Sequence, residues 1–277
     1  MSTPENDARK TRSIEVEVEV PGTPEQVWEA IATGPGITAW FVPAEVDERE
    51  GGAITTYHGP GMEAPGTVTS WDPPRRLVYE EDFGPRDEAP ATLATEFLVE
   101  ARSGGTCVVR LVSSLFGGGA DWDRELESME EGWDGYLHNL RLYLTHFPGM
   151  RCSTIMVSGT APGTQGDAWS ALTSALGLGE LVEGRRVEAG SDAPALAGVV
   201  ERVANDWLTL RVDEPSAGIA MVGVYTWDER VNTSFHAYLF GDEAPAVAAR
   251  EEAAWQAWMD ARFPFVSAVT EAGATTA

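Results

Sequence analysis

An internal repeat constrains the fold of this chain more than any other feature of its sequence. Pro21-Gly-Thr and Pro162-Gly-Thr are each followed by a tryptophan, Trp28 and Trp169, seven positions after the proline. In both copies the threonine is placed to cap the N-terminus of the helix that contains the tryptophan. The repeat therefore predicts two domains with the same order of elements.

Strand patterns accompany each copy of the repeat. Residues 14–20 alternate strictly between apolar residues and glutamate, which predicts a half-buried strand with its valines on one face. Residues 154–158 form a weaker counterpart before the second copy. Further along, residues 66–79 and 198–210 both have the pattern of a strand, a tight turn and a second strand. The two halves thus share a predicted hairpin as well.

Each half ends in an aromatic-rich helical segment that is closed by Phe-Pro, at 124–147 and at 247–263. Proline cannot continue a helix, and the residue before it is disfavoured in the helical region. This places a domain boundary near 148–151. The expected organisation is a disordered tail at 1–12, a domain at 13–148, a second domain at 151–266 and a disordered tail at 267–277.

The first half supplies the clearer pattern of elements. It predicts a strand at 13–20, helices at 24–33 and 35–42, strands near 51–58, 64–71, 76–82, 91–101 and 105–114, and a long helix at 121–146. This order favours an α+β fold, in which a curved antiparallel sheet wraps around the long C-terminal helix. The second half follows the same order in fewer residues, so we expect a shortened copy.

Composition excludes several classes of protein. The 277 residues have a formal net charge of −25, and Lys10 is the only lysine. Such a charge repels phosphate backbones and anionic membrane surfaces, so we expect no nucleic-acid partner. We also expect no membrane insertion, because no apolar run approaches the length of a membrane helix and the N-terminus lacks the apolar core of a signal peptide. With two cysteines only, Cys107 and Cys152, we predict free buried thiols and a cytoplasmic, acidic protein.

The sequence offers little support for catalysis or for a cofactor. His138 and His146 lie eight positions apart, which is not the spacing that places two metal ligands on one helix face. No serine-hydrolase or phosphate-loop motif is present. His58 ends a predicted strand, where it is either an exposed loop residue or an acid or base at the mouth of a pocket. We therefore expect no metal and no cofactor, and a non-enzymatic protein rather than an enzyme.

Aromatic and aliphatic residues form the more informative set. They recur at helical spacing on the long helix, and by alternation on the predicted strands. Each of them either fills a core or lines a ligand cavity, and the hydroxyls of three tyrosines could contact a mostly apolar ligand. The candidates for a ligand cavity are Trp28, Trp40, Phe41, Ile54, Tyr57, Tyr79, Phe97, Val109, Met129, Trp133, Tyr136, Leu137 and Leu140.

Several short motifs follow one another in the first half. They are the run 20–28, the pair Trp40-Phe41, the turn Glu50-Gly51-Gly52, the segment 72–79 and the pair Gly132-Trp133. In this order they resemble the START-like (SRPBCC, helix-grip) superfamily, in the branch of the activator of heat-shock-protein ATPase. The resemblance spans about residues 13–147 and implies a helix-grip fold. The second half resembles the same family less closely and is interpreted as a degenerate copy.

The resemblance implies several functions rather than one. Members of the superfamily enclose an apolar cavity between sheet and long helix and bind lipids, sterols, polyketides or hormones; others regulate chaperones, and some catalyse cyclisation. Our leading hypothesis is a non-enzymatic protein that binds a small apolar or amphipathic ligand in the first domain. The alternatives are a chaperone-regulating or other protein-interaction module, and a cyclase or hydrolase that uses His58 or Tyr79 in the same cavity.

The second domain is expected to be mainly structural, because it is shorter and lacks a counterpart of Trp40-Phe41. Its aromatic residues should fill its core or face the first domain. These residues are Trp207, Tyr225, Trp227, Phe235, Trp255 and Trp258.

Overall fold

The computed structural model describes residues 11–59, 61–83, 91–116, 122–227 and 230–264. The chain divides into two compact units, Met1–Gly149 and Met150–Ala277. The first strand begins at Thr11, so residues 11 and 12 belong to the sheet and not to an N-terminal tail. The rest of the two expected tails, 1–10 and 267–277, lies outside the described residues.

The first unit contains the elements predicted for it, with one addition. They are β1 (Thr11–Pro21), α1 (Pro24–Ala32), α2 (Gly34–Thr38), β2 (Ala44–Val46), β3 (Ala53–Tyr57), β4 (Glu63–Asp72), β5 (Arg76–Phe83), β6 (Ala91–Arg102), β7 (Thr106–Phe116) and α3 (Trp122–His146). The short strand β2 was not predicted, because three residues are too few to show an alternating pattern.

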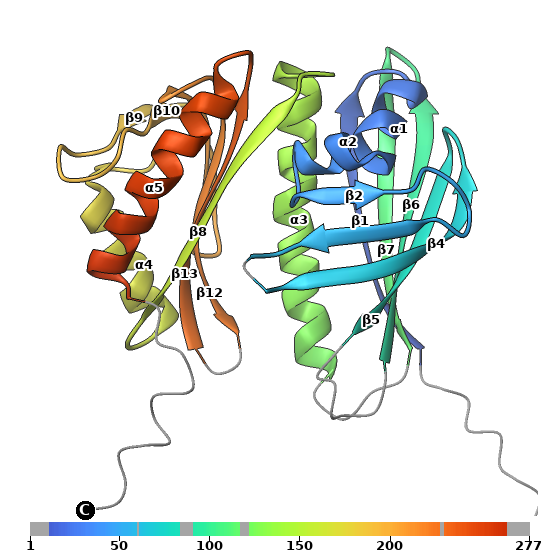
Figure 1. Ribbon diagram of the computed structural model, residues 1–277, viewed down its shortest axis with the longest axis horizontal. Coiled ribbons are helices and arrows are strands. Elements are labelled where there is room, and N and C mark those ends of the chain that lie inside the picture. Colours follow the sequence, from blue (N-terminus) through green and yellow to red (C-terminus); the bar gives the residue numbers. More distant parts are fainter. Residues whose placement is uncertain (1–10, 60, 84–90, 117–121, 228–229, 265–277) are drawn as a thin grey trace, which may run out of the picture. The chain divides into compact units, whose positions relative to one another are not determined.

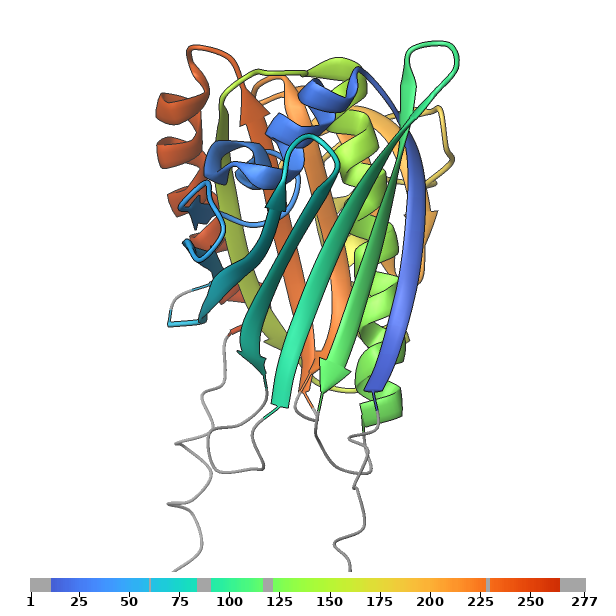
Figure 2. The ribbon, with the colours of Figure 1, turned by 90° about the vertical axis from the view of Figure 1, so that its right-hand side faces the viewer.

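The strands of this unit form one antiparallel sheet in the order β1-β7-β6-β5-β4-β3-β2. Along β6 and β7 buried residues alternate with half-buried ones, so one face of each strand lines the interior. The sheet curves around α3, which lies on its concave side (Figures 1 and 2). The α+β helix-grip architecture expected for the first half is therefore confirmed.

The two short helices follow from local sequence. Thr23 caps α1 in a capping box with Gln26, as the Pro-Gly-Thr motif predicted. Thr33 caps α2 in turn, through a bond from the Gly36 N–H to its hydroxyl. Helix α2 ends at Thr38 instead of extending to residue 42, and the N–H of its C-cap Ala39 bonds to the carbonyls of Gly36 and Ile37.

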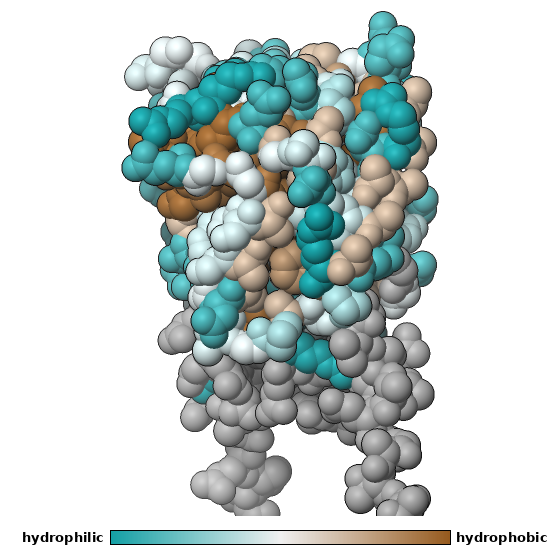
Figure 3. Space-filling view, turned by 90° about the vertical axis from the view of Figure 1, so that its left-hand side faces the viewer, coloured by the Kyte–Doolittle hydropathy of each residue, from teal (hydrophilic) through white to brown (hydrophobic). Residues whose placement is uncertain are grey.

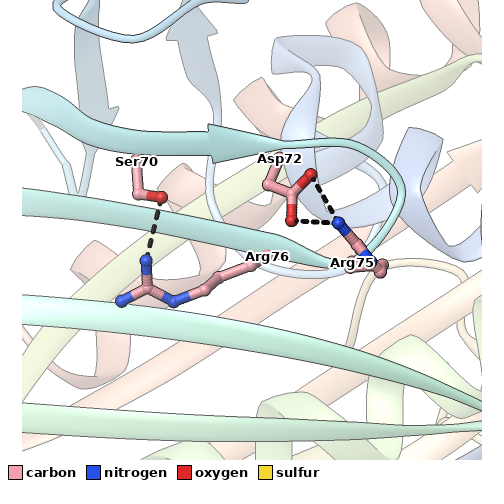
Figure 4. A network of polar contacts seen from close by, with 4 residues as sticks. All are labelled: Ser70, Asp72, Arg75 and Arg76. Carbon is pink, nitrogen blue, oxygen red and sulfur yellow. Dashed lines mark hydrogen bonds and ion pairs between the residues drawn. The ribbon is translucent and has the colours of Figure 1, made fainter.

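The hairpin of β4 and β5 contains a register shift between Val68 and Ser70. Beyond this shift Ser70 lies beside Arg76, whose Nη1 donates to its hydroxyl at 2.9 Å (Figure 4). At the turn, Arg75 Nη2 pairs with both carboxylate oxygens of Asp72. Arg76 also pairs with Glu96 on β6, so these polar contacts tie three neighbouring strands together.

The second unit repeats the order of the first in a shorter form. It contains β8 (Cys152–Ala161), α4 (Gln165–Leu176), β9 (Arg186–Glu188), β10 (Ala197–Ala204), β11 (Trp207–Glu214), β12 (Gly218–Trp227), β13 (Arg230–Phe240) and α5 (Ala244–Arg262). Its six strands have the order β8-β13-β12-β11-β10-β9. The chain passes from α4 to β9 without a second short helix, and α5 has 19 residues where α3 has 25. The expected shortened second copy of the fold is therefore present.

Aromatic residues fill the core of the second unit between its sheet and α5. Phe235 and Trp255 stack with their ring centroids 3.7 Å apart, and Trp258 meets Trp255 edge to face. The side of the unit that bears α4 and α5 is mostly hydrophilic at its surface, with apolar residues between (Figure 3). Within the described residues, no helix is long and apolar enough to cross a membrane.

Two of the aromatic residues expected to fill space do not do so. Tyr225 is 37% exposed and Trp227 is 51% exposed. Both lie at the end of β12, where the strand extends beyond the core, so alternation alone did not reveal their exposure. Trp207 is half-buried because its ring lies flat against Gly223, where a Cβ atom would be 2.2 Å from the ring.

Candidate functional site

The concave face of the first sheet carries a row of hydroxyl groups in an otherwise apolar interior. Tyr79 on β5 lies opposite Thr95 on β6, and Thr95 lies opposite Ser113 on β7. Ile14 on β1 ends the row. All four residues are buried, so the pairing of four neighbouring strands brings three hydroxyls together under α3.

Two of these hydroxyls lack a hydrogen bond of good geometry, although the Thr95 hydroxyl is close enough to the Tyr79 phenol to lower its pKa. Thr95 Oγ1 and Ser113 Oγ are buried, and among the described residues no group accepts from them or donates to them by hydrogen-bond geometry. Both residues are 0% exposed. Buried hydroxyls are normally paired, and leaving one unpaired costs about 1–3 kcal/mol. Their presence on the concave face therefore favours a partner beyond the described residues, and a bound ligand is one such partner.

A carboxyl group lies at one end of this row. Glu81 follows Tyr79 by two residues on β5 and so lies on the same face of the sheet, where it pairs with Gly66 on β4 and Leu93 on β6. A Cβ atom at Gly66 would lie 2.9 Å from the Glu81 Cγ, so the glycine makes room for the glutamate side chain. Burial raises the pKa of Glu81 to about 7.

Hydrogen bonds connect this carboxyl to a histidine. The Thr56 hydroxyl on β3 donates to Glu81 Oε1 at 3.4 Å, and His58 Nε2 lies 3.0 Å from the same hydroxyl oxygen. Thr56 is buried, whereas His58 is exposed as a whole residue. Partial desolvation of the ring still lowers the pKa of His58. The three side chains thus form a polar chain from the interior to the edge of the sheet.

The phenol of Tyr79 is the third titratable group of the interior. Burial raises its pKa, and the nearby Glu81 carboxyl raises it further. Tyr79 is therefore a neutral hydroxyl at every ordinary pH, available as a hydrogen-bond donor or acceptor. Tyr79 was predicted as a possible acid or base. Its raised pKa keeps the phenol protonated, so it favours neither role and suits Tyr79 to a neutral hydrogen bond instead.

An aromatic cluster adjoins the polar chain through His58. The Phe41 ring lies 5.8 Å from the His58 ring, 4.8 Å from Trp133 and 4.7 Å from Tyr136, measured between ring centroids. Trp133 also meets Phe97 edge to face. Aromatic residues from the segment after α2, from α3 and from β6, all named from the sequence as candidates for a ligand cavity, are thus in contact with one another.

Hydrogen bonds fix the position of this cluster. Trp40 Nε1 donates to the Ala30 carbonyl at 2.9 Å, and Asn139 Nδ2 on α3 donates to the Trp40 carbonyl at 2.6 Å. Asn139 is fully buried, and its Oδ1 has no partner among the described residues. These bonds hold the segment after α2 against α3.

Most of the residues proposed from the sequence to line a cavity are buried on the inner side of the first unit. Tyr57 is an exception, because it lies on the face of β3 opposite to Ile54 and Thr56. There desolvation raises its pKa most, and the charges of Glu45 and Glu63 raise it further. Met129 and Tyr136 are half-buried. The buried candidates are Trp28, Trp40, Phe41, Ile54, Tyr79, Phe97, Val109, Trp133, Leu137 and Leu140.

The sequence analysis missed the polar part of this site. Thr56, Thr95 and Ser113 occupy inward positions of strands that were predicted, so strict alternation would have placed them inside. Glu81 was not among the candidates named from the sequence. The signal available was its two-residue spacing from Tyr79, which puts both side chains on one face.

The two cysteines are free, as expected, but only Cys107 is buried, while Cys152 is half-buried. Burial raises the pKa of Cys107 and raises that of Cys152 to about 12. Both are therefore protonated thiols at neutral pH and poor nucleophiles.

Part of the first unit matches the model of a known family. Residues 21–145 match the model of the family described as Activator of Hsp90 ATPase homolog 1-like protein. No curated protein matches the chain in sequence.

Several solved structures are similar to the chain. MLL2253 from Mesorhizobium loti is 19% identical and covers 49% of this chain and 98% of its own, with a TM-score of 0.43. BexL, a di-domain ARO/CYC from the BE-7585A biosynthetic pathway, is 13% identical and covers 92% of this chain and 100% of its own, with a TM-score of 0.43. DynU16, from the dynemicin biosynthetic locus, is 18% identical and covers 90% and 97%, with a TM-score of 0.42.

The family model confirms the resemblance inferred from the sequence for the first half. The order of strands and helices shows the same architecture in both units. Residues 21–145 of this chain thus match the model of the Activator of Hsp90 ATPase homolog 1-like family, and the helix-grip fold occurs twice in the chain.

Proposed function

We propose that the first unit binds a small, mainly apolar molecule between its curved sheet and α3, with a polar group of the ligand against the hydroxyl row. The observation that supports this most is the buried hydroxyl of Ser113, which has no partner among the described residues, beside that of Thr95, which lacks a hydrogen bond of good geometry and has only the Tyr79 phenol close by. A ligand that hydrogen-bonds to them would recover the free energy that their desolvation costs. Pockets for small molecules commonly combine apolar walls with a few polar groups of this kind.

The second unit offers no equivalent row. In its described part, the core between sheet and α5 is formed by apolar residues, with the Phe235–Trp255 stack at its centre. The one hydroxyl that shares the inner face of β13 with Phe235 is that of Thr233, which is bonded to the Met259 sulfur at 3.3 Å. We therefore assign ligand binding to the first unit and a structural role to the second.

A binding screen tests this function. The full chain is incubated with a panel of fatty alcohols, flavonoids and polyketides, and complexes are detected by native mass spectrometry and by a shift in melting temperature. We expect at least one class to bind at micromolar concentration and to raise the melting temperature.

Matched variants show whether the hydroxyl row is the binding site. Thr95→Val and Ser113→Ala should lower the affinity about fivefold to tenfold each, because each removes one hydrogen bond to the ligand. Thr92→Val is the control, since Thr92 lies on the opposite face of β6. Binding that no variant of the row weakens, or a panel from which nothing binds, would refute the proposal.

The family description supports a second candidate, a module that regulates a chaperone of the Hsp90 type. A pull-down with the full chain and purified Hsp90, read out with the ATPase rate, tests this candidate directly. We expect no change in the rate if ligand binding is the function of the first unit, whereas stimulation would favour the second candidate.

A further inference from the structure

We infer that the ligand of the first unit is an amphipathic amine, whose ammonium group pairs with the Glu81 carboxylate and whose apolar part lies among the aromatic residues. This inference rests on the proposed function and adds the chemical class of the ligand. Three observations support it: a half-buried carboxyl without a cationic partner among the described residues, an adjoining aromatic cluster, and a polar chain that leads from the carboxyl toward solvent.

The first observation is the lack of a counter-ion. Burial raises the pKa of the Glu81 carboxyl, and among the described residues only the hydrogen bond from Thr56 shifts it besides. The other titratable groups near it are Tyr79 on β5 and His58, directly after β3, and both are neutral near pH 7. β4 and β6 contribute Gly66 and Leu93 opposite it, which have no charge. Glu81 is half-buried, and a desolvated carboxylate is costly unless it is paired, so a cationic group of the ligand would supply the partner that the described residues do not.

The second observation is the aromatic cluster. Phe41, Trp133 and Tyr136 lie with their ring centroids within 4.7–6.4 Å of one another, and Phe41 meets His58, the far end of the polar chain. Aromatic faces attract cations as well as apolar groups. An ammonium group with an apolar chain therefore suits this arrangement, whereas a carboxylate ligand would be repelled by Glu81.

The third observation is the chain Glu81–Thr56–His58. When an ammonium binds, Glu81 has to be ionised, and a protonated Glu81 has to release its proton. When Glu81 is protonated, the Thr56 hydroxyl can turn so that it accepts the proton from Glu81 Oε1 and donates its own to His58 Nε2, and the exposed His58 ring then releases a proton to solvent. No bond other than O–H and N–H bonds forms or breaks in this transfer, and the proton ends in water.

Matched probes test the inference on the full chain. Decylamine and decanol have the same apolar chain and differ in charge, and their affinities are measured by titration calorimetry below the concentrations at which they aggregate. At pH 7.5 we expect decylamine to bind at least about tenfold more tightly than decanol, from one added buried ion pair. Between pH 5.5 and 7.5 the affinity for decylamine should rise roughly 20-fold as Glu81 ionises, whereas that for decanol should not rise.

Variants assign the effect to the carboxyl. Glu81→Gln should abolish both the preference for decylamine and its pH dependence, and should leave decanol binding within about twofold. Glu80→Gln is the matched control, because it removes the same charge from the neighbouring exposed position. Thr56→Val removes the hydrogen bond that lowers the pKa of Glu81, so the rise in decylamine affinity should move to higher pH.

The outcomes separate the two proposals. If decanol and decylamine bind equally well, or if Glu81→Gln leaves decylamine binding unchanged, the inference on ligand class is wrong while ligand binding stands. If neither probe nor any member of the wider panel binds, both proposals fail.

Discussion

Glu81 makes the stability of the protein depend on pH in a direction unusual for a carboxyl group. Its folded pKa of about 7 lies above the ordinary value of 4.5, so the protonated form favours the folded state. The contribution is fully present below the unfolded pKa and is lost as pH rises through the folded pKa. Between about pH 5 and pH 8 the free energy of unfolding should therefore fall by roughly 2–3 kcal/mol on account of this residue alone.

Glu81→Gln measures that contribution, because glutamine has nearly the same shape and does not titrate. We expect the variant to be more stable than the wild type near pH 8 and similar to it near pH 5, as determined by urea unfolding at both pH values. A difference that does not change with pH would show that the Glu81 pKa is ordinary in the folded protein.

The hydroxyls of Thr95 and Ser113 make a separate prediction at the same scale. Thr95→Val should leave the ligand-free protein equally stable or stabilise it by about 1 kcal/mol, because it removes a buried group whose desolvation is not offset by a hydrogen bond. Thermal unfolding is the measurement, and Thr92→Val is again the reference. A loss of more than about 1 kcal/mol would mean that Thr95 is paired within the protein.

At the scale of elements, the crossing of β8 and the end of α5 depends on one glycine. A Cβ atom at Gly159 would lie 2.2 Å from the Phe263 carbonyl oxygen, which also accepts from the Thr160 N–H at 3.1 Å. Gly159→Ala should therefore force the helix end away from the strand and cost about 1–3 kcal/mol or more.

Gly166 on α4 is a suitable control for that variant. Nothing lies within 4 Å of a Cβ atom at this position, so Gly166→Ala should be neutral or should stabilise the helix by up to about 1 kcal/mol. Both variants are compared by urea unfolding followed by circular dichroism. Equal stability of the two would show that α5 does not end against β8 as described.

At the scale of the whole molecule, the two units should differ in function. We predict that residues 1–149 expressed alone bind the ligand of the full chain, and that residues 150–277 alone do not, because the core of the second unit is filled by its own aromatic residues. Each fragment is checked for cooperative unfolding before binding is measured. If the second fragment binds as well as the full chain and the first does not, the division of roles is the reverse of ours.

The sequence by itself determined the repeat, the order of elements and the start of several helices, because these depend on local patterns. Thr23 and Thr164 were identified as N-caps from neighbouring residues alone, and both cap their helices. The alternation of residues 14–20 likewise fixed which face of β1 is buried. By contrast, the strand β2 and the early end of α2 depend on too few residues to produce a pattern.

Only the tertiary structure decided the composition of the candidate site. The chain Glu81–Thr56–His58 joins two strands that are separated by β4, so it exists only once their register is set. The burial that raises the pKa of Glu81, and that leaves Thr95 and Ser113 without a hydrogen bond of good geometry, results from the sheet curving around α3. Local sequence fixes backbone propensities and the faces of strands, whereas desolvation and pairing between distant side chains arise only from packing.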